Sequence, residues 1–120
     1  MASDGGSLVT GGDSILISES TSGNPSQFVN ISNIHSRGNL RNGITLQHSL
    51  YVNVKNATIY NIGQVAYIIS SLSGKQVSYT NLTNCNSDDA NLGLHIGGYG
   101  STYSTTINGG NIANNDGAGS

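Results

Sequence analysis

The sequence predicts an all-β protein, folded as a right-handed parallel β-helix of about three to four rungs. One observation is a strand pattern that ends on an asparagine and recurs at nearly even steps, at Asn33, Asn56 and Asn81. Another is a small residue that follows each of these asparagines at a nearly constant offset, at Gly43, Ala66 and Gly93. In addition, no stretch places apolar residues at helical spacing over the length of a helix. Two landmarks that keep their offset over three copies indicate a solenoid.

The repeat divides the chain into a lead-in and a body. Residues 1–26 form a flexible lead-in, in which residues 14–18 have the pattern of a short strand, either a first partial rung or a cap. Residues 27–120 form the body of parallel β-helix rungs. Its four rungs are expected at residues 27–49, 50–74, 75–100 and 101–120. The register of the last rung stays open, because Asn108 and Asn111 both fit the pattern in part.

Equivalent residues of successive rungs are expected to stack into columns, because neighbouring strands lie about 4.8 Å apart. The expected apolar columns are Val29–Val52–Val77, Ile31–Val54–Tyr79 and Leu46–Ile69–Ile96. Asn33, Asn56 and Asn81 are expected to form a ladder inside the coil, because asparagine tolerates the left-handed backbone of a sharp bend. The third rung is slightly longer between its landmarks, so we expect an outward loop at residues 84–91.

Composition argues against several classes of function. The net charge is −2, and no basic stripe for nucleic acid is expected from only four permanent cations, Arg37, Arg41, Lys55 and Lys75. No apolar run approaches the roughly 20 residues that span a membrane, and no signal peptide opens the chain. Cys85 is the only cysteine and is expected to be a small buried residue. No metal or cofactor is expected, because metal-ligand spacing and a dense acidic cluster are both lacking.

The rung patterns VNISNI, VNVKNATI and VSYTNLTN, rich in asparagine and almost free of charge, resemble the body of a bacteriophage tailspike or tail-fibre protein. They are similar, more distantly, to the pectate-lyase-like superfamily. The resemblance covers about residues 27–120 and rests on rung patterns, not on a catalytic motif. It implies a homotrimer in the extracellular virion tail that binds bacterial surface polysaccharide, often with cleavage by a pair of acidic side chains. It also implies a fragment of a longer chain, because such bodies have more rungs.

Three aspartates are the candidate catalytic residues, since hydrolysis of a glycosidic bond uses two carboxyl groups roughly 5 to 10 Å apart. Asp88 and Asp89 lie in the extra length of the third rung. Asp116 precedes a glycine one rung later, as Asn42 precedes Gly43. The pattern fits a glycoside hydrolase of the endoglycosidase type, with Asp88 or Asp89 paired with Asp116 or with a residue of a neighbouring subunit. The alternative for Asp88 and Asp89 is a solvated turn, so the sequence leaves open whether the chain is an enzyme.

Tyrosines are the best candidates for sugar contacts, because a phenol ring offers an apolar face and a polar edge. Tyr99 and Tyr103 lie in the long connection after residue 96, and we expect them to line an outer face with the acids. The alternative for both tyrosines is plain loop packing. His95 alternates with two apolar residues, so it is expected to face outward and is a third binding candidate. Tyr67 is expected to lie in the core.

Two other functions fit the same pattern. One is a purely structural β-helical shaft or adhesin module without a ligand. The other is a secreted pectate-lyase-like enzyme, which the shortage of Lys and Arg and of calcium-binding acids disfavours. The oligomeric state separates these functions, since a trimer favours the tailspike interpretation and a monomer favours the enzyme.

Overall fold

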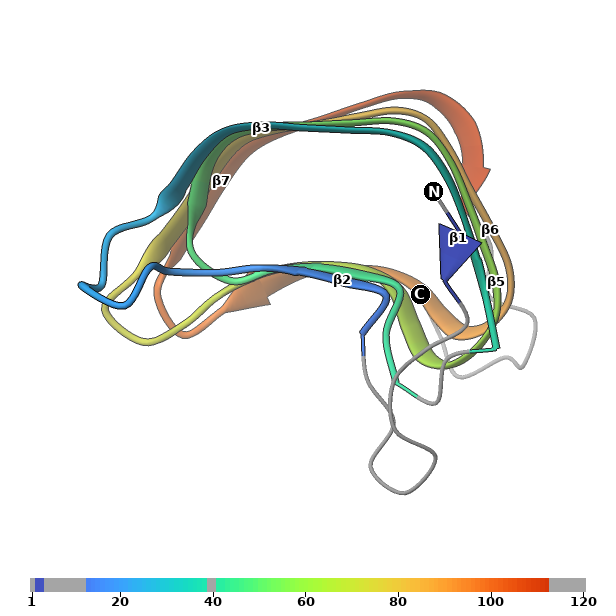
Figure 1. The fold of residues 1–120 in the computed structure, drawn as a ribbon, viewed down its shortest axis with the longest axis horizontal. Coiled ribbons are helices and arrows are strands. Elements are labelled where there is room, and N and C mark those ends of the chain that lie inside the picture. The colour runs from blue at the N-terminus through green and yellow to red at the C-terminus, as the bar shows by residue number, and fades with distance from the viewer. Residues whose placement is uncertain (1, 4–12, 39–40, 113–120) are drawn as a thin grey trace.

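The computed structural model describes residues 2–3, 13–38 and 41–112, and these residues coil into a parallel β-solenoid of about four turns (Figure 1). The strands are β1 (Ala2–Ser3), β2 (Ile15–Ile17), β3 (Ser26–Arg37), β4 (Ile44–Leu46), β5 (Ser49–Ser71), β6 (Gln76–Gly98) and β7 (Ser101–Ile112). Every pairing between these strands is parallel, and the described part of the chain contains no helix. The predicted all-β class and the parallel solenoid are therefore confirmed.

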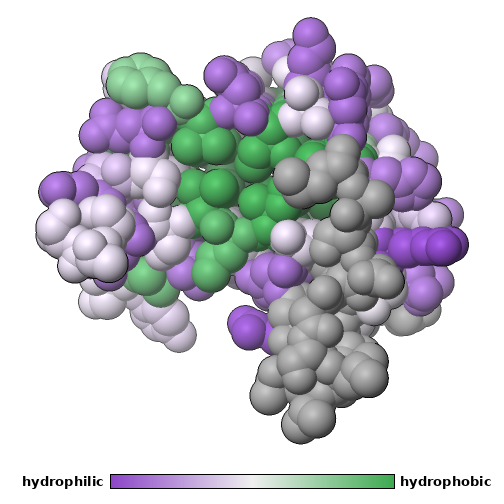
Figure 2. Space-filling model, in the orientation of Figure 1, coloured by the Kyte–Doolittle hydropathy of each residue, from purple (hydrophilic) through white to green (hydrophobic). Residues whose placement is uncertain are grey.

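The core is a thin column of stacked aliphatic side chains inside the coil. Ile31 lies beside Val54 one turn on, then beside Leu82 and Ile107. On the opposite side, Leu46, Ile69 and Ile96 stack as expected. Viewed along the solenoid axis, apolar residues gather within the coil and polar residues form its rim (Figure 2). Each turn thus buries one line of side chains against the turns next to it, as in other solenoids.

The coil bends at single residues with left-handed backbone, and these residues lie five positions apart along the chain. The first bend is formed by Phe28, Tyr51, Tyr79 and Ser104, the second by Asn33, Asn56, Asn84 and Gly109, and the third by Gly38, Asn61 and Asp89. Asparagine, aspartate and glycine tolerate this conformation, which explains the second and third bends. A bulky side chain with positive φ is an outlier, so the aromatic residues of the first bend need another explanation.

The third turn is shifted from its expected register. Val52 pairs with Thr80, and Val77 pairs with Ser49, so the column Val29–Val52–Val77 is wrong. Tyr79 was expected in the core beside Val54, but it lies at the first bend and is exposed. The cause is that asparagines occur at both 81 and 84, and the spacing alone does not decide which one continues the ladder.

The expected loop at residues 84–91 is also wrong, because the extra residues of this turn lie elsewhere. Ile62 pairs with Ala90 and Val65 with Leu92, so β6 is one residue shorter than β5 there. The insertion lies between β5 and β6, in the connection of residues 72–75. The hydrophobic face of a strand fixes its register strongly, so the extra length is placed where no core residue is displaced.

The predicted small column is confirmed, since Gly43, Ala66 and Gly93 are equivalent and buried. A Cβ on Gly43 would lie 2.3 Å from the carbonyl oxygen of Ala66, so the turns approach too closely there for a side chain. Tyr67 is buried as expected, and its hydroxyl donates to the carbonyl of Asn86 at 2.7 Å. Cys85 is also buried as expected.

Candidate functional site

An exposed column of aromatic rings runs along the first bend, parallel to the solenoid axis. Phe28 stacks on Tyr51 with ring centroids 5.0 Å apart and planes 2° apart, and Tyr51 stacks on Tyr79 at 4.7 Å and 4°. Tyr103 closes the column edge-on to Tyr79, at 6.2 Å and 75°. The four residues are 72%, 43%, 45% and 46% exposed. Three successive turns thus hold large rings in a strained backbone conformation at the surface.

Two asparagine ladders lie beside the aromatic column. In the first, Asn53 Nδ2 donates to Asn30 Oδ1 at 3.0 Å, and Asn81 Nδ2 donates to Asn53 Oδ1 at 2.8 Å. In the second, Asn56 donates to Asn33 at 3.4 Å and Asn84 donates to Asn56 at 3.0 Å. The predicted ladder therefore exists, but it continues to Asn84 instead of Asn81. It also lies outside the coil, because Asn33, Asn56 and Asn84 are all exposed.

A groove of about 420 Å³ crosses the surface between these ladders. We call it the Asn groove; the outward side chains along it are those of Asn30, Ser32, Asn53, Lys55 and Thr83. Ser32, Lys55 and Thr83 are equivalent in three turns, so a row of hydroxyl, ammonium and hydroxyl groups faces a row of amides. Amides and hydroxyls both donate and accept hydrogen bonds. The groove is therefore suited to a ligand rich in hydroxyl groups.

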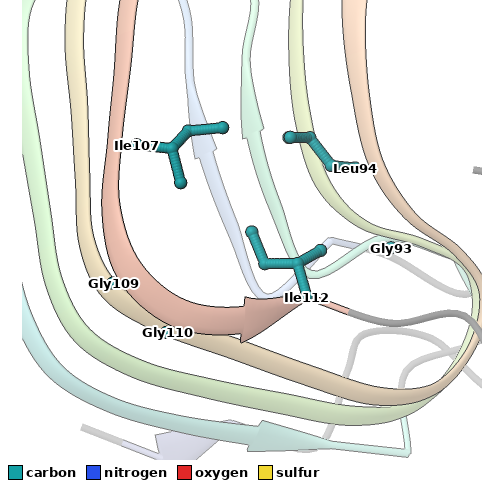
Figure 3. A pocket seen from close by; sticks show the side chains of 6 residues that line it. All are labelled: Gly93, Leu94, Ile107, Gly109, Gly110 and Ile112. Atoms are coloured by element: carbon teal, nitrogen blue, oxygen red, sulfur yellow. The ribbon is translucent and has the colours of Figure 1, made fainter.

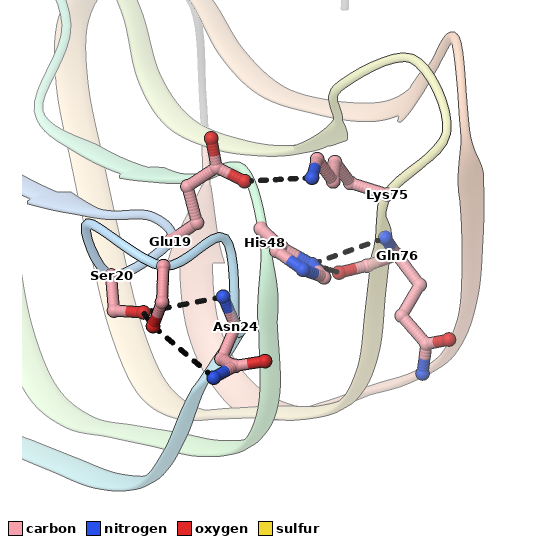
Figure 4. A network of polar contacts seen from close by, with 7 residues as sticks. Glu19, Ser20, Asn24, His48, Lys75 and Gln76 are labelled. Carbon is pink, nitrogen blue, oxygen red and sulfur yellow. Dashed lines mark hydrogen bonds and ion pairs between the residues drawn. The ribbon is translucent and has the colours of Figure 1, made fainter.

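Polar contacts link the connections between turns (Figure 4). Lys75 Nζ lies 3.0 Å from Glu19 Oε2, which joins the connections of two turns. His48 Nδ1 lies 3.1 Å from the backbone oxygen and 3.3 Å from the backbone nitrogen of Gln76. Gln76 Nε2 in turn lies 3.5 Å from the hydroxyl of Tyr103. These contacts link the connections that precede β3, β5 and β6, and Gln76 reaches the aromatic column at Tyr103.

The candidate catalytic acids lie at a different edge of the coil. Asp89 occupies the third bend with φ 51°, stacked on Asn61, and its N–H donates to Asp88 Oδ1 at 3.0 Å. Asp88 is equivalent to Tyr60 and is exposed. Asp116 lies outside the described residues, so the proposed pairing with it stays a prediction. The left-handed backbone gives Asp89 a structural reason to be an aspartate.

The three candidate binding residues are not brought together either. Tyr103 joins the aromatic column at the first bend, whereas Asp89 lies at the third bend. Tyr99 lines a hollow on the side of the coil formed by β4 and the end of β5. His95 is exposed, as expected, and is equivalent to Ile68 on that same side. The expected surface shared by the acids and both tyrosines is therefore spread over several edges of the coil.

Phe28, Tyr51 and Tyr79 were not among the predicted site residues, although the sequence contains a signal for them. Each precedes an asparagine of the second bend by five positions (28 to 33, 51 to 56, 79 to 84). This spacing reveals both the bend and the correct register of the third turn. The Asn groove was missed because it depends on that register.

Two further features lie in the core or beside it. An apolar hollow of about 350 Å³ lies beside β7, where the side chains of Leu94, Ile107 and Ile112 border a common space (Figure 3). Cys85 and Tyr67 lie next to each other in the core. Burial raises the pKa of both groups, so the thiol and the phenol remain protonated at neutral pH. A protonated, buried thiol is a poor nucleophile.

Comparison with protein-family models, curated proteins and solved structures gives no match. Within the described ranges, no group of three or more His, Cys, Asp or Glu residues could hold a metal ion. The same ranges contain no helix with the length and apolar character needed to cross a membrane.

Proposed function

We propose that this protein binds a polysaccharide across the aromatic column and the Asn groove. The observation that carries the proposal is the column Phe28–Tyr51–Tyr79. Its rings are exposed, and its residues have a left-handed backbone conformation that bulky residues normally avoid. Strained residues persist where the surrounding structure holds them, and they cluster at functional sites. Exposed aromatic residues beside convergent polar groups are typical of a binding surface.

The chemistry of the surface suits a sugar polymer. Rings and their hydroxyls offer apolar contact and hydrogen bonds to pyranose units, and the amide ladders add donors and acceptors. Equivalent groups recur every turn, about 4.8 Å apart along the axis, so a repeating ligand meets a repeating surface. The described residues between the first and second bends include no acid and only Lys55 as a cation. Neutral contacts therefore dominate this surface.

The source of the polysaccharide is proposed from the rung patterns. Their resemblance to phage tailspike bodies favours a bacterial surface polysaccharide, a homotrimer and a place in the virion tail. The alternative is a structural shaft, in which the rings and amides only stabilise the stack of turns. Sedimentation of the purified chain tests the trimer, and the binding experiment below separates a binding surface from a shaft.

The test uses substitutions that keep the bend. Tyr51→Asn and Tyr79→Asn remove a ring but place a residue that tolerates left-handed backbone. Binding of a panel of purified bacterial surface polysaccharides is measured by calorimetry. We expect each variant to bind at least about tenfold more weakly, which corresponds to about 1.4 kcal/mol. Tyr60→Asn removes a ring from the strand segment after the second bend and should bind like the parent protein.

Equal binding of a polysaccharide by the parent and both variants would place the binding site outside the aromatic column, whereas no binding to any member of the panel would leave the shaft as the better explanation. A melting curve for each variant shows whether weaker binding follows from unfolding. Asn53→Ala provides a second variant outside the bend, since it interrupts the first ladder at its centre.

Cleavage of the bound chain by Asp88, Asp89 or Asp116 remains a prediction. Release of reducing ends from the polysaccharide is the measurement, with Asp88→Asn, Asp89→Asn and Asp116→Asn as the variants. If the chain hydrolyses its ligand through these acids, at least one variant should bind normally and lose cleavage. Cleavage at the parent rate in all three would remove these acids from the mechanism.

A further inference from the structure

The hollow that Tyr99 lines has a volume of about 210 Å³ and lies on the side of the coil formed by β4 and the end of β5. This side faces away from the surface of β3 that carries the Asn groove (Figure 1). Thr45 lines the hollow and is only 3% exposed, and its Oγ1 has no hydrogen-bond partner. A buried hydroxyl without a partner is destabilising. Because Thr45 stands in the wall of a hollow, a ligand bound there could complete this hydrogen bond, which distinguishes it from the unpaired hydroxyls of Ser49, Thr80 and Thr105, which do not line the hollow.

The polar groups around Thr45 can both donate and accept. Asp13 Oδ1 lies 3.9 Å from Arg41 Nε and accepts a hydrogen bond from Asn42 Nδ2 at 3.1 Å. The carboxylate and the guanidinium therefore balance each other's charge. Gln47 also lines the hollow and adds an amide. A neutral ligand with several hydroxyl groups fits this set better than an ion, because each hydroxyl can donate and accept in turn.

The same hollow has an apolar part. Leu72, Ile68 and Tyr99 line it, and Tyr99 is 91% exposed. A ring this free of packing offers an apolar face to a ligand. The lining thus combines polar and apolar groups, which matches the two kinds of surface on a pyranose.

We infer that this hollow, the Thr45 pocket, binds one pyranose unit of a neutral sugar. Thr45, Gln47 and Asp13 contact its hydroxyl groups, and Tyr99 covers its C–H face. The inference rests on residues that the aromatic column and the Asn groove do not share. It therefore stands or falls independently of polysaccharide binding at those surfaces.

The test is a titration of the labelled protein with D-glucose, D-galactose and N-acetyl-D-glucosamine, followed by amide chemical shifts. Sodium acetate and glycine serve as ionic probes. We expect at least one sugar to shift the amides of Thr45, Gln47 and Ser70 at millimolar concentration. Thr45→Val replaces the hydroxyl by a methyl group of similar size and should weaken that binding at least tenfold. Tyr99→Ala should weaken it as well.

Thr80→Val is the matched control. Thr80 also carries a buried hydroxyl without a partner, but it does not line this pocket. Both valine variants should melt at or above the parent temperature, because each removes an unpaired buried hydroxyl. Only Thr45→Val should lose sugar binding, and Tyr51→Asn should keep it. The inference is overturned if no sugar shifts these amides, if Thr45→Val binds like the parent, or if acetate or glycine binds in place of sugars.

Discussion

Tyr51 and Tyr79 lie a full turn of the solenoid apart in the sequence, yet their rings stack with centroids 4.7 Å apart and planes 4° apart. Both residues occupy the first bend, where the preceding turn places Phe28. The turn from β5 to β6 is longer than the turn from β3 to β5, as the equivalent positions Val29, Val52 and Thr80 show. The aromatic column therefore keeps its geometry across turns of different length, because the insertion lies outside the paired strands.

The asparagines of the second bend have two roles that substitutions can separate. Asn56→Ala removes the ladder amide and also places a Cβ residue without a polar group at φ 56°, where the left-handed region costs roughly 1–2 kcal/mol. Asn56→Gly removes the same amide but accepts the backbone. We expect Asn56→Ala to lower the free energy of unfolding by roughly 1 kcal/mol more than Asn56→Gly, measured in urea. Equal losses would show that the ladder, not the bend, sets the preference for asparagine.

The periodic parts of the fold were predictable because burial enforces them. Leu46, Ile69 and Ile96 were placed correctly, since an apolar residue that slips by one position would face solvent. The register of the third turn was not predictable from the asparagines, because Asn81 and Asn84 each continue a ladder. Their side chains point outward, so hydrophobic burial does not distinguish them.

The candidate site depends on this outward register, and so less of it was predictable. Tyr103 was singled out as an exposed aromatic, and it does join the column. Tyr79 was assigned to the core because its distance from Asn81 imitates that of Val54 from Asn56. The Thr45 pocket combines residues from β4, β5, four connections and the segment before β2, and no local spacing reveals such a combination.

A charge in the core should be severely destabilising. Val54 is 1% exposed and stacks between Ile31 and Leu82. Val54→Asp places a carboxyl group there without a partner, in a core only one side chain wide. We expect the free energy of unfolding to fall by at least about 3 kcal/mol, or the protein not to fold. Thr58→Asp, at an exposed position of the same strand, should cost less than about 1 kcal/mol. Similar melting temperatures for Val54→Asp and the parent would refute the core assignment.

The close approach at Gly43 should tolerate no side chain. A Cβ there would lie 2.3 Å from the carbonyl oxygen of Ala66 and 2.7 Å from Cγ2 of Ile59. Relief requires movement of a backbone that is already hydrogen-bonded, since the Gly43 N–H donates to the Val65 carbonyl at 2.9 Å. We expect Gly43→Ala to cost more than about 2 kcal/mol in thermal or urea unfolding.

Gly109→Ala is the control for this close approach. A Cβ on Gly109 meets nothing within 4 Å, so its only cost is the left-handed backbone at φ 67°, roughly 1 kcal/mol. An equal loss of stability in the two alanine variants would mean that contact with the next turn does not limit Gly43.

The buried pair Tyr67 and Cys85 should make the fold sensitive to alkali. Burial raises the pKa of Tyr67 above its ordinary value of 10.0, and it raises the pKa of Cys85 above 9.0. The folded state therefore keeps these protons at pH values where the unfolded chain releases them. Stability from this source is complete below about pH 9 and falls as pH rises, first through Cys85 and then through Tyr67. Each group contributes a slope of at most about 1.4 kcal/mol per pH unit.

Substitution of Tyr67 or of Cys85 should remove the part of the pH dependence of unfolding that each residue contributes. Tyr67→Phe loses the hydrogen bond to Asn86, so we expect unfolding at pH 7 to become easier by roughly 1–2 kcal/mol. Above pH 10, however, stability should fall less steeply than in the parent, and Cys85→Ala should flatten the range that begins near pH 9. Urea unfolding from pH 7 to 11 provides the measurement. An alkaline limb of Tyr67→Phe parallel to that of the parent would show that this phenol ionises as readily in the fold as in the unfolded chain, contrary to its burial.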